Sequence, residues 1–320
     1  MKVLITGANG FIGQALFQAL QGNNIAVRAS VRDATTSHLA CSSQSEVMAI
    51  GDIGPKTDWS RSLTGVSCVV HCAARTHVMH ETEADTLTAY LGVNVDGTRS
   101  LAEQSARSGV KRLVFLSSIH VNGMATDEVG CFAYDDTPQP HESYAVSKWE
   151  AEQVLLEVAE KTGLEVVIVR PPLVYGPGVK GNFLRLLQLV GRGIWLPLGA
   201  VRNQRSLVGL DNLIDVLVRC IDHPNAPGSI FLVSDGHDIS TPALIQALAR
   251  AMNKPARLLP VPLWMMRLAG RVTGKSNELK RLTGSLRVDI NHTRETLCWS
   301  PPVSVDEGLK KTVEWYKSTC

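Results

Sequence analysis

Lys2-Val3-Leu4-Ile5-Thr6 runs directly into Gly7-Ala8-Asn9-Gly10-Phe11-Ile12-Gly13 at the start of this chain. The first segment is a short apolar run typical of a buried strand, and a helix is predicted after the glycines, over residues 14–21. Glycines at these three positions permit a tight turn, close approach of the backbone to a pyrophosphate and close packing of the helix. The free amides at the start of such a helix bind phosphate. The stretch therefore predicts a dinucleotide-binding turn with contacts from Gly7, Asn9, Gly10, Phe11 and Ile12.

Strands and helices alternate through the first half of the chain. Predicted strands cover residues 25–30, 47–50, 68–73, 111–117 and 165–170, and long helices are predicted over 86–108 and 142–161. The strands are nearly continuous apolar runs, as expected where helices cover both faces of a sheet. This alternation predicts an α/β fold with a Rossmann-type, doubly wound parallel sheet.

Glycine and proline interrupt the pattern after Pro171-Pro172. We predict a dinucleotide-binding domain over residues 1–172, with a returning segment at about 205–240 that includes a strand at 229–233. A smaller, interleaved substrate lobe is predicted over 173–204 and 241–320, with helices at 241–253 and 263–272.

Composition excludes several classes of function. The net charge of +2 over 320 residues gives no general affinity for nucleic acid or membranes. The N-terminus lacks a signal-peptide layout, and no apolar run is long enough to span a bilayer. Seven scattered cysteines suit a reducing compartment, so a cytoplasmic protein is expected. His71, Cys72, His77 and His80 do not have the spacing of a metal site, and none is predicted.

Tyr144 and Lys148 stand four residues apart on a predicted helix, which places them on one helical face. An ammonium beside a phenol lowers the tyrosine pKa, so a poor acid becomes usable near neutral pH. A hydroxyl such as that of Ser118 can hold a carbonyl or alcohol oxygen beside the phenol. We predict that Ser118, Tyr144 and Lys148 are catalytic and that hydride moves between a substrate carbon and a nicotinamide.

The end of the second predicted strand bears on the choice of cofactor. Ser30 stands where NAD sites usually carry an acidic residue, with Arg28 and Arg32 nearby and Asp33 as a partial substitute. Because arginine suits a 2′-phosphate, NADP(H) is favoured, with NAD(H) possible. Asp52-Ile53 follows the third predicted strand and is expected near the adenine ring.

The chain resembles the extended short-chain dehydrogenase/reductase family, in its UDP-glucose 4-epimerase-like, NAD-dependent epimerase/dehydratase branch. The resemblance covers nearly the whole chain. It rests on the glycine turn, Asp52-Ile53, His71 to Ala74, Asn94 within Val93 to Thr98, Ser117-Ser118, Tyr144 and Lys148, and Arg170 to Pro177. It implies that Ala73, Ala74 and Asn94 lie beside the cofactor, Pro171 and Leu173 beside the nicotinamide, and Lys148 on the ribose.

The second half of the chain resembles the nucleotide-sugar branch of that family. Asn182 matches an amide and Arg205 an arginine that hold a diphosphate in such enzymes. His77 and His120 are further candidates for sugar contacts. A nucleotide-diphosphate sugar is therefore the expected substrate. An apolar carbonyl substrate is the alternative, but it needs no diphosphate clamp.

Three reactions are typical of this branch: 4-epimerisation, 4,6-dehydration and 4-keto reduction. Dehydratases of the family carry an Asp-Glu pair after the catalytic hydroxyl, whereas Ser118 is followed by Ile119-His120. Segments 73–79, 117–123, 196–200 and 232–236 resemble bacterial O-antigen enzymes that reduce UDP-4-keto-6-deoxy-N-acetylhexosamines. This resemblance, with the NADP(H) preference, favours a 4-keto reductase of lipopolysaccharide sugar synthesis. The alternative is an NAD-dependent UDP-glucose or UDP-N-acetylglucosamine 4-epimerase, or an epimerase of a lipid-linked sugar.

Two surface predictions remain. The basic, apolar segment from Arg257 to Lys275 fits either a helix packed on the substrate lobe, which is preferred, or a membrane-surface helix, so membrane contact is not expected. The helix around Trp149, Val154, Leu155 and Val158 fits either an apolar stripe packed in the core of the chain or a dimer interface. Enzymes that resemble this family often pair through such helices, and a homodimer is expected.

Overall fold

A computed structural model describes residues 1–37, 39–76, 83–127, 130–272, 274 and 276–319. The nine strands are β1 (Lys2–Thr6), β2 (Ala26–Val31), β3 (Ser45–Ala49), β4 (Cys68–His71), β5 (Arg112–Leu116), β6 (Glu165–Arg170), β7 (Leu173–Tyr175), β8 (Leu207–Gly209) and β9 (Ile230–Leu232). The α-helices are α1 (Phe11–Gly22), α2 (Ser60–Leu63), α3 (Glu83–Tyr90), α4 (Gly97–Arg107), α5 (Ser143–Thr162), α6 (Gly181–Gly191), α7 (Leu210–Asp222), α8 (Thr241–Ala251), α9 (Leu263–Val272), α10 (Ser276–Thr283), α11 (Asn291–Leu297) and α12 (Val305–Thr319).

Seven strands form one parallel sheet in the order β3-β2-β1-β4-β5-β6-β9. Strand order reverses beside β1, which is the topology of a doubly wound dinucleotide-binding sheet. The predicted fold class is therefore confirmed, and the strand expected over 229–233 is β9, which pairs with β6.

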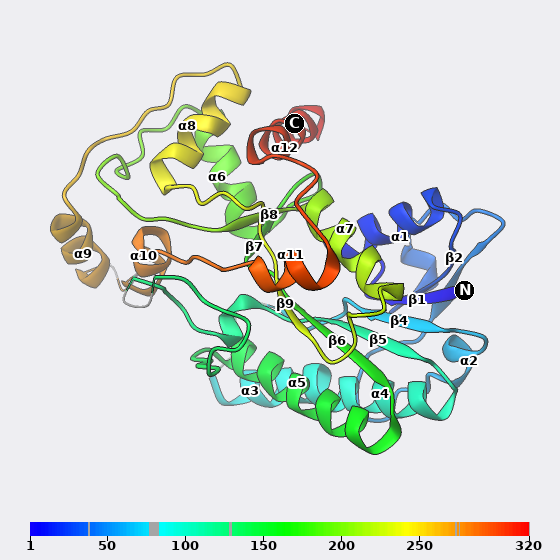
Figure 1. Ribbon diagram of the computed structural model, residues 1–320. Coiled ribbons are helices and arrows are strands. Elements are labelled where there is room, and N and C mark those ends of the chain that lie inside the picture. The colour runs from blue at the N-terminus through cyan, green and yellow to red at the C-terminus, as the bar shows by residue number, and fades with distance from the viewer. Residues whose placement is uncertain (38, 77–82, 128–129, 273, 275, 320) are drawn as a thin grey trace.

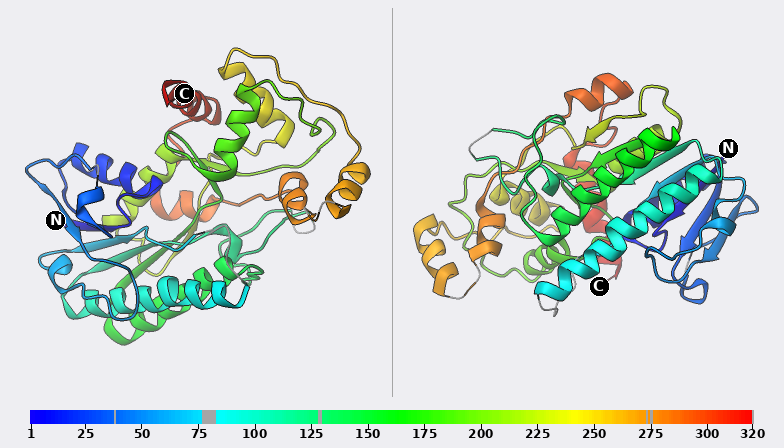
Figure 2. Two further views of the ribbon diagram at one scale, coloured as in Figure 1. Left: turned by 180° about the vertical axis from the view of Figure 1, so that it is seen from behind. Right: turned by 90° about the horizontal axis from the view of Figure 1, so that it is seen from below.

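Helices cover both faces of this sheet (Figure 1). One face carries α1 and α7, which pack against each other, and the other carries α4 and α5, which lie side by side across the sheet in Figure 2. Alternate residues of β1 serve the two layers, since Val3 and Ile5 join the core beneath α1 and α7 while Leu4 joins the core beneath α4 and α5. Burial on both faces explains the continuous apolar sequence of the strand.

A smaller lobe lies over the carboxyl ends of the strands (Figure 1). It contains the two-stranded parallel sheet β7–β8, which the sequence pattern does not reveal, and helices α6, α8, α9, α10 and α12. A separate apolar core, which includes Tyr175, Phe183, Leu187, Leu248 and Leu309, lies within this lobe. The chain enters the lobe after β6, returns through α7 and β9 to the main sheet, and then leaves again.

A stretch of π-helix, η2 (Leu91–Asp96), joins α3 to α4. The sequence pattern predicts one helix over 86–108, and the structure has three consecutive helical segments there. Asn94 and Val95 are buried within η2. The wider turn directs Asn94 towards the site described next, as π-helical turns often do for functional side chains.

Candidate active site

The glycine turn between β1 and α1 approaches the loop after β4 closely. Gly7 has a φ of +67°, and a Cβ added there would lie 2.8 Å from the backbone nitrogen and Cα of Ala73. The amide of Gly10 donates to the carbonyl of Gly7 at 2.9 Å, which closes the turn. A side chain at Gly7 is therefore excluded by both backbone conformation and space. The structure brings two predicted cofactor segments, 7–13 and 73–74, together at the carboxyl edge of the sheet.

Helix α1 starts at this turn without a side-chain cap. Its N-cap residue is Gly10, and its first turn carries no acidic residue. The amides and the positive end of the helix dipole are thus left for an anion. This arrangement fits the pyrophosphate of a dinucleotide. Asn9, Phe11 and Ile12, which were predicted as contacts, lie in or next to this turn.

Ser118, Tyr144 and Lys148 come from adjacent segments at the same edge of the sheet. Ser118 follows β5 and caps the short 3-10 helix η3 (Ile119–Val121), because its Oγ accepts from the amide of His120 at 3.3 Å. Tyr144 and Lys148 occupy the first two turns of α5, which packs against η3. The amide of Ile119 donates to the carbonyl of Pro171 at 3.0 Å, so the segment predicted beside the nicotinamide adjoins the segment of Ser118.

The protonation of Tyr144 and Lys148 is governed by burial. Burial, and secondarily the nearby Tyr90, raise the pKa of Tyr144 to about 12. The Tyr90 ring meets it edge-on, with centroids 6.1 Å apart. Burial lowers the pKa of Lys148 to about 7, against the opposing charge of Glu152. The expected lowering of the tyrosine pKa by the ammonium is therefore not observed in the protein alone, where desolvation of the phenolate raises that pKa.

The ammonium of Lys148 lies over the aromatic ring of Phe115. Its Nζ lies 3.8 Å from the centroid of the Phe115 ring on β5, and that ring stacks on His71 of β4 with centroids 5.7 Å apart. A cation over an aromatic face is attracted to it electrostatically. This contact fixes the side chain even though its charge is partly desolvated.

A buried polar network behind Lys148 was not predicted from the sequence. Glu152, one helical turn further along α5, accepts a hydrogen bond from Ser117 and forms an ion pair with Arg170, whose Nη2 lies 2.5 Å from its Oε2. A second nitrogen of Arg170 donates to Asn122 at 2.9 Å. The Lys148-Glu152 spacing of four was the available signal, but the arginine is brought in only by the pairing of β5 with β6. The network joins three segments at the carboxyl edge of the sheet.

Asn94 holds the β4–α3 loop against α5. Its Oδ1 accepts from the amide of Arg75 at 2.8 Å, and its Nδ2 donates to the Arg75 carbonyl at 3.1 Å and to Ser147 Oγ at 3.0 Å. Ser147 in turn donates to the carbonyl of Tyr144 at 2.8 Å. Asn94, predicted as a cofactor contact, therefore positions the tyrosine segment and the loop next to it.

His71 is a neutral structural side chain. Burial lowers its pKa to about 3, with the charge of Lys148 acting in the same direction. Thr98 donates to the carbonyl of Asn94, so its oxygen accepts from His71 Nε2 at 3.0 Å, and Thr6 donates to Nδ1 at 2.6 Å. Within the part of the chain that the structure describes, no group of three or more His, Cys, Asp or Glu side chains is placed to hold a metal ion.

Arg28, which the sequence suggested as a ligand of a 2′-phosphate, is not available to a cofactor. Arg28 is buried, pairs with Glu46 at 2.7 Å and donates to three carbonyls of residues 61–64. It cannot serve a cofactor phosphate, because Arg28 and Glu46 face each other in the register of β2 and β3. Arg32 is exposed and lies 2.8 Å from Asp52. Ile53 packs beneath α4, where its Cγ2 would meet a Cβ added at Gly97.

The predicted substrate contacts lie in different surroundings. Asn182 is exposed at the start of α6. Leu173, which was predicted as a cofactor contact beside the nicotinamide, is exposed at the start of β7. Arg205 is held between lobe segments, because its Nη1 donates to the carbonyls of Arg281 at 2.6 Å and Gly284 at 3.2 Å. His120 lies two residues after Ser118, and its amide donates to Ser118 Oγ. His77 lies outside the described residues.

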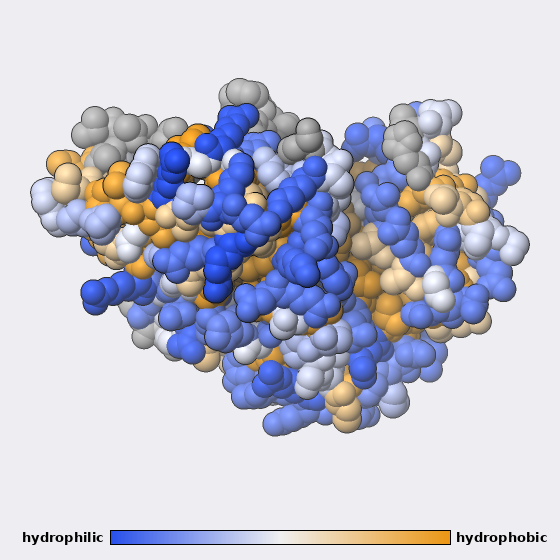
Figure 3. All heavy atoms as spheres, turned by 90° about the horizontal axis from the view of Figure 1, so that it is seen from above, coloured by the Kyte–Doolittle hydropathy of each residue, from blue (hydrophilic) through white to orange (hydrophobic). Residues whose placement is uncertain are grey.

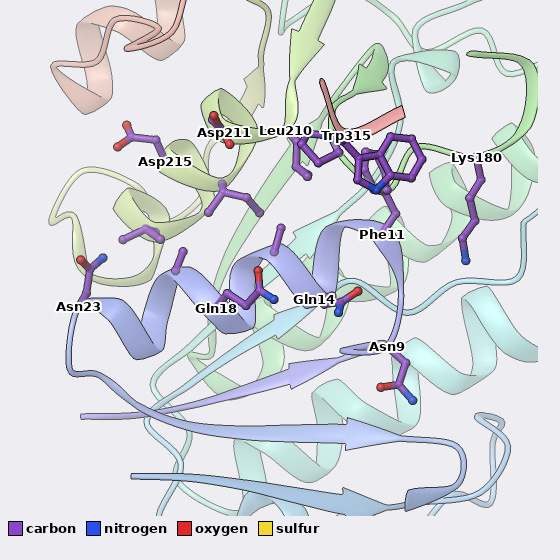
Figure 4. A pocket seen from close by; sticks show the side chains of 16 residues that line it. Asn9, Phe11, Gln14, Gln18, Asn23, Lys180, Leu210, Asp211, Asp215 and Trp315 are labelled. Carbon is purple, nitrogen blue, oxygen red and sulfur yellow. The ribbon is translucent and has the colours of Figure 1, made fainter. Parts of the chain in front are cut away.

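A groove of about 730 Å³ runs along α1 between that helix and α7 (Figure 4). It extends from Asn9 and Phe11 at one end to Asn23 at the other. Tyr144 and Lys148 do not line it. The groove therefore meets the predicted cofactor site only at the glycine turn.

The fold and site define a Rossmann-type protein with the tyrosine–lysine pair of a dinucleotide-dependent oxidoreductase. A family model, the NAD dependent epimerase/dehydratase family, matches residues 3–234. The chain belongs to this family, which confirms the resemblance seen in the sequence.

Individual relatives extend over the whole chain. A UDP-glucose 4-epimerase from Vibrio cholerae is 48% identical over 98% of this chain and 94% of the relative. An N-acetyl-alpha-D-glucosaminyl-diphospho-ditrans,octacis-undecaprenol 4-epimerase from Escherichia coli O157:H7 is 27% identical over 98% of this chain and 95% of the relative. The solved UDP-glucuronic acid 4-epimerase from Bacillus cereus, in complex with NAD, aligns over 100% of this chain and 99% of its own, with a TM-score of 0.81 and 24% identity. That last match concerns the fold.

Proposed function

We propose that this protein is a UDP-sugar 4-epimerase. The observation that carries the proposal is the 48% identity to the Vibrio cholerae UDP-glucose 4-epimerase over 98% of the chain. It is supported by a site that retains the hydroxyl, the phenol and the ammonium in one place. The 4-keto reductase that the sequence favoured is less well supported than this alternative.

Ser118, Tyr144 and Lys148 have separate roles in the proposed reaction. Ser118 holds the oxygen on sugar carbon 4. Tyr144 first gives up its own proton, and the resulting phenolate takes the proton of that oxygen and later returns it. The ammonium of Lys148 stabilises the phenolate that forms transiently and holds the cofactor ribose. A bound nicotinamide would take the hydride from carbon 4 and give it back. Epimerisation then requires that the sugar presents its other face before the hydride returns.

Tyr144 is protonated over the whole neutral range when its pKa is about 12. The proton on the phenol must therefore leave against a desolvation penalty, and positive charge brought near the ring lowers that penalty. Lys148, four residues further along the same face of α5, can supply such charge. Its charge is maintained by Glu152, which raises the lysine pKa.

NAD(H) is the cofactor that we propose. The preference for NADP(H) rested on two arginines, and Arg28 is occupied by Glu46 and backbone carbonyls. Arg32 alone remains, and it is paired with Asp52. Family membership and the NAD complex of the Bacillus cereus structure support the unphosphorylated cofactor.

The substrate lobe, residues 173–204 and 241–320, would receive the nucleotide diphosphate through Asn182 and Arg205. Residues 1–172 and about 205–240 would carry the dinucleotide. We also propose a homodimer and a role in lipopolysaccharide sugar synthesis, which rest on the family resemblance. A cytoplasmic location is proposed from the seven scattered cysteines.

The test is to incubate purified protein with UDP-glucose, without added cofactor, and to follow UDP-galactose by proton NMR. The same equilibrium mixture reached from either sugar would establish a 4-epimerase, and UDP-N-acetylglucosamine would be tested in parallel. Tyr144→Phe is the inactive control. Failure with both sugars, together with stoichiometric NADPH oxidation by a UDP-4-keto-6-deoxy-N-acetylhexosamine, would overturn the proposal in favour of the reductase.

A lipid-linked sugar diphosphate is a second candidate substrate. The full-length likeness to the Escherichia coli undecaprenol-diphosphate sugar 4-epimerase favours it. The same NMR assay with N-acetylglucosaminyl-diphosphoundecaprenol in detergent separates the two substrates. Conversion of this lipid and not of UDP-sugars would identify the second candidate.

A further inference from the structure

The lobe carries a surface that the proposed reaction does not use. At the end of the molecule formed by α9, Trp195, Leu259, Trp264, Met265 and Leu268 are exposed. Figure 3 shows hydrophobic residues gathered among hydrophilic ones at this end of the molecule. We call these five residues the α9 face. Trp264 and Leu268 lie four positions apart on the helix and so share one side of it.

Helix α9 already buries its other side. Met266 is buried in the lobe core, and Leu263 packs against it. The expected packing of this helix on the lobe therefore holds for one side only. Trp264 remains 67% exposed, Leu268 57% and Trp195 57%, which is unusual for such large apolar side chains in one region of a soluble surface.

The segments of the α9 face are joined by the backbone. The amide of Leu196 donates to the carbonyl of Arg257 at 2.9 Å, and the amide of Leu259 donates to the carbonyl of Leu196 at 2.8 Å. The guanidinium of Arg257 lies 5.8 Å from the ring centroid of Trp195. The Trp195 loop and the approach to α9 thus form one supported surface.

The charged side chains of the segments that form this surface have one sign. Arg192, Arg257, Arg267 and Arg271 are exposed in these segments. The sequence contains no Asp or Glu from residue 166 to 210 or from 239 to 277, although the whole chain has 30 acidic residues. A second copy of the same surface would bring arginine against arginine without a carboxylate from these segments to pair with. The complementary partner is apolar and anionic at once.

We infer that the α9 face docks on an anionic lipid bilayer. Tryptophan and leucine side chains enter the interfacial region, and the arginines meet lipid phosphates. The helix lies on the membrane and does not cross it, and no helix in the described ranges is both long and apolar enough to cross one. The docked face is tied to the reaction site, because α10 follows α9 and its Arg281 forms an ion pair with Glu142, two residues before Tyr144.

Vesicle flotation of the whole 320-residue chain tests whether the protein binds anionic lipid bilayers. Vesicles of phosphatidylcholine alone are compared with vesicles that also contain phosphatidylglycerol, at low salt. We expect at least about tenfold more protein on the anionic vesicles, and a loss of that preference as salt screens the arginines. Equal binding to both vesicles, or binding to neither, would overturn the inference.

Matched variants assign the binding to the face. Trp264→Gln with Leu268→Gln should reduce binding about tenfold, whereas Leu156→Gln, at an exposed leucine of α5, should leave it unchanged. Arg267→Gln with Arg271→Gln should remove the preference for anionic lipid, and Arg107→Gln on α4 is the control for charge. Loss of binding in the control variants to the same degree would contradict the assignment.

Two readouts keep this inference separate from the proposed function. UDP-sugar epimerisation and melting temperature should be unchanged in the Trp264→Gln, Leu268→Gln variant. Sedimentation velocity without vesicles should also be unchanged. A smaller particle in the variant would instead identify the α9 face as a contact between protein copies and overturn membrane docking.

Discussion

Glu152 and Arg170 form a fully buried ion pair one helical turn beyond Lys148, with Nη2 2.5 Å from Oε2. Glu152 has two further roles in this position. It accepts a hydrogen bond from Ser117, next to Ser118, and its charge raises the pKa of Lys148. One carboxylate therefore connects the folding of the site to the protonation of Lys148.

Glu152→Gln should destabilise the protein and shift its pH profile. Breaking a buried pair leaves Arg170 without a counter-charge, which costs about 3–5 kcal/mol of unfolding free energy. Since Glu152 supports the charge on Lys148, its neutralisation lowers the lysine pKa below about 7, and turnover should decline at a lower pH on the alkaline side. Urea unfolding and a kcat–pH profile measure the two effects. Glu160→Gln, at an exposed site on the same helix, is the control, and an equal shift there would refute the role of Glu152.

Lys148→Met should change how stability depends on pH. Burial lowers the lysine pKa from 10.5 to about 7 in the folded protein, so between these values only the unfolded chain takes up the proton. This group therefore makes the wild-type protein less stable as pH falls from about 10 to about 7. The stability advantage of the variant should be larger near pH 7 and shrink as pH rises. Chemical denaturation of both cofactor-free proteins across this range measures the difference, and a pH-independent difference would contradict the assigned pKa.

Tyr144→Phe should remove catalysis and keep binding. The ring and its edge contact with Tyr90 remain, but no proton can be exchanged with the sugar oxygen. Turnover should fall by about 10³-fold or more, within the range for loss of a general acid–base group. Calorimetric affinities for NAD and UDP should change by less than about threefold, since neither needs the phenol proton. Tyr134→Phe, at an exposed tyrosine that stacks on His292, should retain full activity.

Gly7→Ala should impair cofactor binding. The new Cβ would lie 2.8 Å from the Ala73 backbone at a φ of +67°, so the turn and the β4 loop must separate. NAD affinity should fall at least tenfold, with a loss of about 1–3 kcal/mol in stability from the strained conformation. Gly22→Ala provides the control, because a Cβ at that end of α1 meets nothing within 4 Å. Equal NAD affinity in the two variants would rule out the turn as the binding element.

Much of the architecture follows from local sequence. The strands of the main sheet are short apolar runs covered on both faces. The glycine turn indicates the first connection from a strand to a helix. The number of strands in the main sheet and its parallel topology could therefore be predicted. The β7–β8 sheet could not, because each of its strands has only three residues and their pairing joins Leu173 to Leu207 across an intervening helix. The π-helical turn at Asn94 could not be predicted either, because its sequence is equally compatible with an ordinary α-helix.

The site shows the same division. The spacing of Tyr144 and Lys148 is visible in the chain, but their protonation is not, because desolvation depends on what the fold places around them. The sequence predicts that Arg28 binds a cofactor phosphate, but the register of β2 and β3 places it opposite Glu46, with which it forms an ion pair. Glu152 gave little signal, because its partner Arg170 lies on another strand. A single sequence does not show which charged residues from distant segments will form ion pairs in the folded protein.

The returning strand β9 has a consequence for biosynthesis. Its partner β6 ends at residue 170, yet β9 begins at residue 230, so the ribosome must deliver 59 further residues (171–229) before that sheet edge is covered. A nascent chain paused in this interval presents the backbone of β6 to other strands, which invites aggregation. Premature stop codons before residue 230 should therefore yield insoluble fragments and not a free-standing nucleotide-binding half.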